Sequence, residues 1–92
     1  MKVIFSDQAL KNLKEIRDFI ALDSYERAVS FVEEILAAIE RIPDNPFRFR
    51  KSIYHDQEMY RDMIYKKYTI VFKIIDHTVF ILTVFRSKYY AG

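Results

Sequence analysis

The chain gathers its chemically versatile side chains, cations and phenols, in its second half. Residues 47–92 hold nine Lys or Arg against four Asp or Glu, whereas residues 1–46 hold six against nine. Such a basic half could face nucleic acid, the ribosome or an acidic protein segment, because local charge steers encounters. A mixed-charge surface without a binding role is the alternative. The set comprises Arg48, Arg50, Lys51, Arg61, Lys66, Lys67, Lys73, Arg86 and Lys88, with Tyr60, Tyr65, Tyr68, Tyr89 and Tyr90.

These side chains could hold RNA, or cut it without a metal ion. Guanidinium and ammonium groups neutralise phosphates, and aromatic faces stack on unpaired bases. Metal-free cleavage needs a group that takes the 2′-hydroxyl proton, a cation that stabilises the pentacoordinate phosphate and an acid for the leaving oxygen. Tyrosine and arginine are equally common in protein interfaces, so the composition does not choose between RNA and protein.

Other chemistries lack the residues that they need. The single glycine is Gly92, so no glycine-rich phosphate loop can exist. Cysteine is absent, which removes disulfides, thiolate metal sites and thiol nucleophiles and fits a reducing cytoplasm, where we expect the protein. His55 and His77 have no metal-ligand spacing around them, so we expect neither a metal nor a cofactor. No apolar segment is long enough to predict a signal peptide or a membrane span.

The first half must supply the elements that position these side chains. Residues 2–5 have the composition of a strand, and Ser6 is an N-cap for a helix with an apolar stripe at residues 9, 13, 16 and 20. Asp23 with Glu26 resembles a capping box that starts a second helix, which Pro43 ends. The acidic residues of both helices, Glu34 among them, fit solvated faces. We therefore predict a helical hairpin.

The second half predicts an antiparallel meander. Residues 47–52 form a loop or a sheet edge, and strands follow at 58–65, 68–75 and 78–85, separated by two-residue turns without glycine. The unbroken apolar run near residues 79–85 indicates that both faces of the last strand are covered, either by a partner or by the domain itself. The expected fold is α+β, a single domain over 1–92, with an N-terminal strand and a helical hairpin packed on an antiparallel sheet (β-α-α-β-β-β).

Four segments in this order resemble the RelE/ParE toxin superfamily of type II toxin–antitoxin systems. IFSDQALKNLKEI is similar to the family's first strand and helix, and ERIPDNPFRFR to the exit of its second helix. YRDMIYKKYTIVFKI and ILTVFRSKYY are similar to its later strands, the last of which ends in arginine. The resemblance implies a toxin that inhibits growth, as in plasmid stabilisation, and that is neutralised by a cognate antitoxin.

The resemblance leaves three functions open. RelE-like members cut messenger RNA on the ribosome, and here the catalytic set would be Arg61, Lys66 (or Lys67), Arg86 and Tyr89. ParE-like members poison DNA gyrase, and this branch is favoured because Met63 and Thr69 stand where RelE-like toxins place basic residues and because the helical hairpin is long. The third is a degenerate member that only binds its antitoxin.

The partners follow from the same resemblance. We expect the antitoxin, and DNA gyrase or the ribosome with its mRNA as the target, with no membrane contact. A homodimer, or a heterotetramer with the antitoxin, is compatible with the family. The predicted partner-binding residues are Arg48, Arg50, Lys51, Arg61, Phe80, Leu82 and Arg86.

Overall fold

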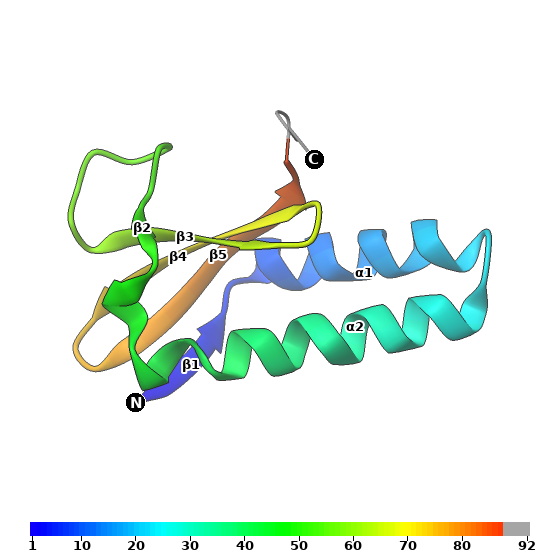
Figure 1. The fold of residues 1–92 in the computed structure, drawn as a ribbon, viewed down its shortest axis with the longest axis horizontal. Coiled ribbons are helices and arrows are strands. Elements are labelled where there is room, and N and C mark those ends of the chain that lie inside the picture. Colours follow the sequence, from blue (N-terminus) through cyan, green and yellow to red (C-terminus); the bar gives the residue numbers. More distant parts are fainter. Residues whose placement is uncertain (88–92) are drawn as a thin grey trace.

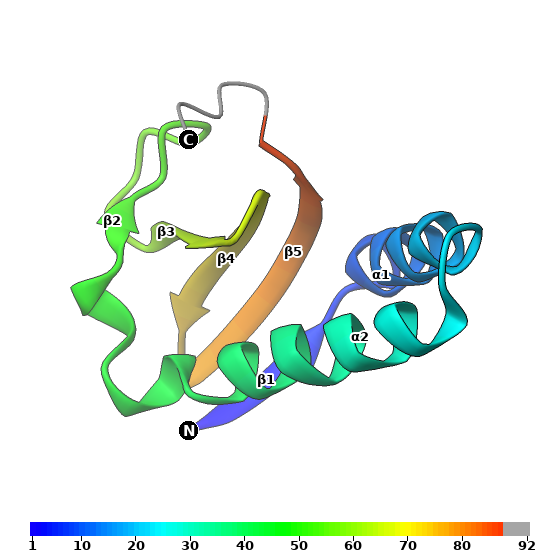
Figure 2. The ribbon, with the colours of Figure 1, turned by 45° about the vertical axis from the view of Figure 1, so that its right-hand side comes forward.

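Two helices lie on one face of a twisted sheet in the computed structural model, which describes residues 1–87 (Figures 1 and 2). The helices and strands are β1 (Lys2–Phe5), α1 (Asp7–Ala21), α2 (Tyr25–Glu40), β2 (Arg50–Lys51), β3 (Tyr60–Tyr65), β4 (Tyr68–Ile75) and β5 (Thr78–Arg86). Two 3-10 turns, η1 (Ile42–Asp44) and η2 (Pro46–Arg48), connect α2 to β2. The prediction of a strand, a helical hairpin and three further strands in this order is confirmed.

Serine side chains start both helices. The Ser6 hydroxyl accepts a hydrogen bond from the Ala9 N–H at 2.9 Å, as its position in the sequence indicates. The second cap was predicted at Asp23, and this is wrong, because Ser24 is the extended residue whose hydroxyl accepts from the Arg27 N–H at 3.2 Å. A cap oxygen reaches the second or third N–H of its helix, so Asp23 stands one residue too early. Its carboxylate pairs instead with the Arg27 guanidinium at 2.8 Å.

The sheet is mixed, with the strand order β1-β5-β4-β3-β2. Strands β3 to β5 form the predicted antiparallel meander and β2 pairs antiparallel to β3, but β1 pairs parallel to β5. A parallel neighbour needs a crossover connection, which here includes both helices. Residues 47–52 were expected to form a loop or a sheet edge. Residues 50–51 form the short edge strand β2, so the expectation of an edge holds for this part of the segment.

The two-residue hairpin turns are confirmed by the register, in which Tyr65 faces Tyr68 and Ile75 faces Thr78. Lys66, Asp76 and His77 have φ angles of 54°, 49° and 54°. This left-handed conformation costs a residue with a Cβ about 1 kcal/mol or more, so both turns hold some backbone strain in place of the usual glycine.

The core lies between the helices and the sheet. It includes Ile35 and Ile39 of α2, which are buried against Phe72 and Ile81 of the sheet. On the outer face, the segment between β2 and β3 covers part of the sheet, and Tyr54 contacts Phe85 edge-on with ring centroids 5.3 Å apart. The domain itself thus covers much of the apolar run in β5. The outward side chains of that run, Phe80, Leu82 and Phe85, are half-buried.

Candidate functional site

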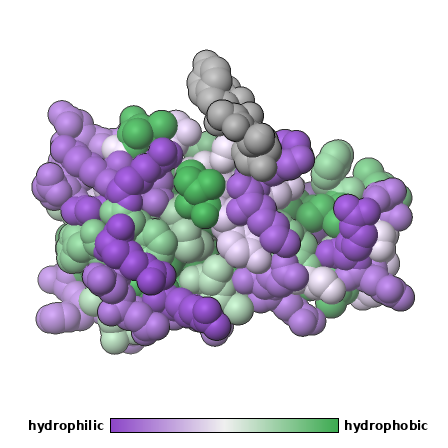
Figure 3. Space-filling model, in the orientation of Figure 1, coloured by the Kyte–Doolittle hydropathy of each residue, from purple (hydrophilic) through white to green (hydrophobic). Residues whose placement is uncertain are grey.

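A groove of about 650 Å³ lies between the helical hairpin and one end of the sheet. The hairpin extends past the sheet, and the β3–β4 turn and the end of β5 lie on its inner side (Figure 1). Figure 3 shows apolar surface on this projecting part of the hairpin, where Phe19 and Leu22 are 66% and 86% exposed. The sheet wall of the groove is basic, whereas its helix wall combines apolar side chains with the polar or charged Asp23, Arg27, Ser30 and Glu34. Its lining is Phe19, Ile20, Leu22, Asp23, Arg27, Ser30, Phe31, Glu34, Lys66, Lys67, Tyr68 and Arg86.

Glu34 of α2 connects the two walls. Its Oε2 accepts hydrogen bonds from the Lys66 ammonium at 2.9 Å and from the Tyr65 hydroxyl at 3.2 Å. Phe31 supports this connection, because its ring packs on Tyr65 and Tyr68 with centroid distances of 6.2 and 5.1 Å. The β3–β4 turn is thus held against α2 by one ion pair and an aromatic cluster.

These contacts shift the pKa values of the three groups away from neutrality. The hydrogen bond from Lys66, with a smaller one from Tyr65, lowers the pKa of Glu34. The same bond raises the pKa of Lys66. Burial and then the hydrogen bond to Glu34 raise the pKa of Tyr65. Glu34 is therefore a weak base, and Lys66 and Tyr65 hold their protons more tightly than usual.

Arg86 completes the groove at the end of β5, where it faces Tyr68 across the β4–β5 ladder. Its side chain is exposed, and within residues 1–87 its guanidinium has neither a hydrogen-bond nor an ion-pair partner. An unpaired guanidinium beside apolar side chains is suited to a carboxylate or a phosphate, which it can bind through two hydrogen bonds.

Arg61 lies elsewhere, near the opposite end of β3. Its Nε donates to the Glu58 carbonyl at 2.9 Å, and Nη1 donates to the Phe49 carbonyl at 3.1 Å. Nη2 pairs with the Glu58 carboxylate at 3.0 Å, and the guanidinium lies 4.8 Å from the centre of the Phe47 ring. Arg61 and Tyr65 are four positions apart in β3, which corresponds to about 13 Å along the strand. Arg61 ties η2 and β2 to β3.

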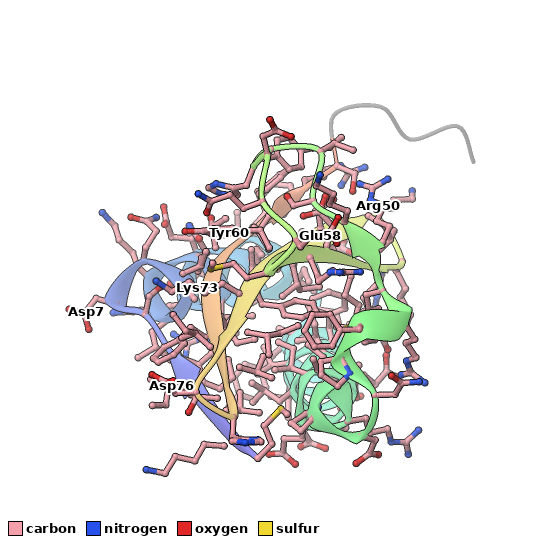
Figure 4. The ribbon with its side chains drawn as sticks, turned by 90° about the vertical axis from the view of Figure 1, so that its left-hand side faces the viewer. Asp7, Arg50, Glu58, Tyr60, Lys73 and Asp76 are labelled. Carbon is pink, nitrogen blue, oxygen red and sulfur yellow. The ribbon has the colours of Figure 1, made fainter. Side chains whose placement is uncertain are left out.

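The other predicted partner-binding cations share that end of the sheet. Figure 4 shows Arg50 and Glu58 beside the segment that joins β2 to β3. Arg50 pairs at 3.2 Å with Asp62, whose side chain is fully buried. Arg48 stacks 4.6 Å from the ring centre of Phe49, and Lys51 lies 3.6 Å from Asp56. These cations bind acids or rings of their own chain.

The predicted residues thus separate into groups. Lys66 and Arg86 meet in the groove, whereas Arg48, Arg50, Lys51 and Arg61 surround β2. Phe80 lies on the outer face with the Lys73 ammonium 5.6 Å from its ring centre, and Leu82 is the extra residue of a β-bulge. Tyr89 lies outside the described residues.

Sequence reasoning missed the helix side of the groove. Phe19 and Leu22 are apolar residues at or beside the end of α1 that the core stripe does not use, and this was the available signal. Glu34 is exposed as predicted, but its ion pair with Lys66 joins residues 32 positions apart, which no local pattern carries.

Within residues 1–87, no three His, Asp or Glu side chains converge in a way that could hold a metal ion. Neither helix has the length and apolarity that crossing a membrane would require.

Solved structures similar to this chain include toxins and toxin–antitoxin complexes. The chromosomal ParDE TA system from P. aeruginosa aligns with a TM-score of 0.79 and 16% identity over 96% of this chain and 97% of that chain. The isolated E. coli RelE toxin aligns with a TM-score of 0.69 and 16% identity over 98% and 87%. The RelBE2 toxin-antitoxin complex from Mycobacterium tuberculosis aligns with a TM-score of 0.57 and 20% identity over 96% and 92%. The fold is that of the RelE/ParE toxins.

The family follows from the sequence itself. No curated protein matches the chain. A family model described as the ParE toxin of the type II toxin-antitoxin system parDE matches residues 3–88. The chain therefore belongs to the ParE toxin family, and the predicted membership of the RelE/ParE superfamily is confirmed.

Proposed function

We propose that this toxin stops growth as ParE-like proteins do, by poisoning DNA gyrase in the cytoplasm, and that it does not cut messenger RNA. The observation that carries the proposal is the composition of the groove. It holds Lys66 and Arg86 without Arg61, which is tied to the Phe49 and Glu58 carbonyls at the other end of β3.

The electrostatics of the groove also argue against RNA cleavage. A nuclease without a metal needs a group that accepts the 2′-hydroxyl proton near neutral pH. The lowered pKa of Glu34 makes it a poor proton acceptor, and the raised pKa values of Lys66 and Tyr65 keep both protonated. Glu34, Lys66 and Tyr65 are therefore poor candidates for this task.

The groove is better suited to a protein segment, and we propose that the cognate antitoxin occupies it. Exposed Phe19 and Leu22 offer apolar surface that an amphipathic helix or strand could bury. Arg86 offers a cation without a partner in residues 1–87, which an acidic side chain of the antitoxin would neutralise. Such a segment gains affinity from apolar burial and loses about 2 to 5 kcal/mol by becoming ordered.

One experiment distinguishes the two toxin mechanisms. The same purified protein is added to a gyrase supercoiling reaction and to ribosomes programmed with messenger RNA. We expect loss of supercoiling with accumulation of cleaved DNA, and no codon-phased cuts in the message. Cuts in the message that disappear in Arg86→Ala would favour the RelE-like alternative, for which the grouping of Lys66, Lys67 and Arg86 in one groove is the supporting observation.

The matched control is Arg41→Ala. Arg41 is an exposed arginine at the C-terminal end of α2, whereas the residues of that helix that line the groove lie between Arg27 and Glu34. Both variants remove one positive charge, so a difference between them reports the position of Arg86 and not the net charge. Normal growth after induction without antitoxin, together with inactivity in both reactions, would favour the degenerate member.

A further inference from the structure

Strand β5 is longer than β1, the strand that pairs with its first residues. β1 pairs with β5 only from Lys2 opposite Thr78 to Phe5 opposite Ile81. The later backbone groups on this edge need other partners, because an unpaired buried N–H or carbonyl is costly. Ser6 supplies two of them. Its N–H donates to the Ile81 carbonyl at 2.9 Å, and its hydroxyl donates to the Leu82 carbonyl at 2.8 Å.

Asn12 of α1 continues this line of partners. Its Oδ1 accepts the Val84 N–H at 3.1 Å and the Thr83 hydroxyl at 2.9 Å. Both bonds use the same oxygen, so a carboxylate at this position could make them equally well. The Asn12 side chain thus provides a hydrogen-bond acceptor to the end of β5, as the backbone of β1 does to its beginning.

A β-bulge lies between the contacts of Ser6 and Asn12. Phe72 of β4 faces Ile81 and Val71 faces Thr83, so Leu82 has no counterpart. One extra residue transfers every later side chain to the opposite face of the sheet. The burial pattern records this change.

Buried side chains occur at Val79 and Ile81 before the bulge and at Val84 after it. Arg86 follows Val84 by two residues, so it shares the helix-facing side, where it lines a hollow with Ile16 and Phe19. In a strand without the bulge, Phe85 would point to the helix-facing side of the sheet and Arg86 to the outer face.

We propose that Asn12 is a positioning residue which, by holding the bulged segment of β5 against α1, directs Arg86 into the groove. The two bonds from Asn12 fix residues 83 and 84, immediately after the bulge and two residues before the arginine. The value of this arrangement for binding rests on the proposed function, in which Arg86 anchors a partner. The orientation of Arg86 does not depend on that function.

The test compares Asn12→Ala with Asn12→Asp in the full chain by NMR. We expect the Val84 amide to exchange with solvent roughly tenfold faster in Asn12→Ala, because its acceptor is lost. Nuclear Overhauser contacts from the Arg86 side chain to Ile16 and Phe19 should weaken in the same variant. Asn12→Asp should restore both, and Gln8→Ala, an exposed amide of the same helix, should change neither.

Unchanged exchange at Val84, or unchanged contacts of Arg86 in Asn12→Ala, would overturn the proposal. A growth assay then tests the link to function through the double variant. If Asn12 acts through Arg86, Asn12→Ala weakens growth inhibition in the parent and has no further effect when Arg86→Ala is already present. Equal losses in both backgrounds would overturn the link. A toxin whose activity ignores Arg86→Ala would refute the proposed role of the groove, while the NMR result would still decide the positioning.

Discussion

Arg61 and Arg86 are two arginines on the same side of one sheet with opposite surroundings. The Arg61 side chain is 13% exposed, and it is bound by carbonyls, a carboxylate and an aromatic ring. Arg86 is exposed and has no polar partner within residues 1–87. A cation whose hydrogen bonds are satisfied within its own domain therefore stabilises the fold. A cation without such bonds is available to a partner.

The two strands next to these arginines explain the difference. β2 pairs with β3 at Lys51 opposite Arg61, so the chain that leads into β2 brings the carbonyls of Phe47 and Phe49 over the guanidinium. The end of β5 has β4 on one edge and α1 on the other. Glu15 of α1 lines the same hollow as Arg86, but no carboxylate or carbonyl of residues 1–87 pairs with the guanidinium. Both arginines lie in strands, and only the neighbours of those strands separate their roles.

The largest difference should appear in the free energy of unfolding. Arg61→Ala removes several charge-assisted hydrogen bonds and should destabilise the protein by about 2 kcal/mol, or roughly 10 °C in Tm. Arg86→Ala removes an exposed side chain without a polar partner in the described chain and should change stability by less than about 0.5 kcal/mol. Urea unfolding monitored by tyrosine fluorescence measures both.

Arg61→Lys sharpens the comparison, because it keeps the charge and loses the planar fork that reaches several acceptors at once. It should recover less than half of the lost stability. Full recovery would mean that charge alone matters at this position, and equal destabilisation by Arg61→Ala and Arg86→Ala would contradict the assignment of the two roles.

Features that depend on residues close together in the sequence could be predicted, and features that join distant segments could not. The helical hairpin, the strands and both two-residue turns depend on local periodicity and were predicted closely. The parallel pairing of β1 with β5 and the carbonyl contacts of Arg61 join distant segments, so no local pattern indicates them. The bulge at Leu82 was hidden for another reason: an unbroken apolar run has no alternation whose shift could be seen.

The two hairpin turns allow a similar comparison with a smaller expected effect on stability. Each turn has a residue with a Cβ in the left-handed conformation, but only the turn at Lys66 lies beside the groove. His77→Gly, at the end of the sheet away from the groove, should stabilise the protein by about 0.5 to 1 kcal/mol because the backbone strain is relieved. Lys66→Gly relieves similar strain but removes the ion pair with Glu34, so its gain should be smaller. Thermal unfolding of both variants gives the order. A larger gain for Lys66→Gly would show that the ion pair contributes nothing to holding the turn.

The smallest effect concerns the protonation of Glu34, on the helix side of the groove. Its folded pKa lies below the ordinary value of 4.5, so its ion pair contributes fully above that pH and is lost as the pH falls through the folded pKa. The pKa of Lys66 is raised above 10.5, so at alkaline pH the contribution is lost only as the pH rises through that raised value. Carboxyl NMR titration should show the Glu34 pKa rising toward 4.5 in Lys66→Met and rising less in Tyr65→Phe, because Lys66 is the stronger influence. An unchanged pKa in Lys66→Met would mean that the β3–β4 turn is not held to α2 by this pair, and that the basic wall of the groove can move independently of the helices.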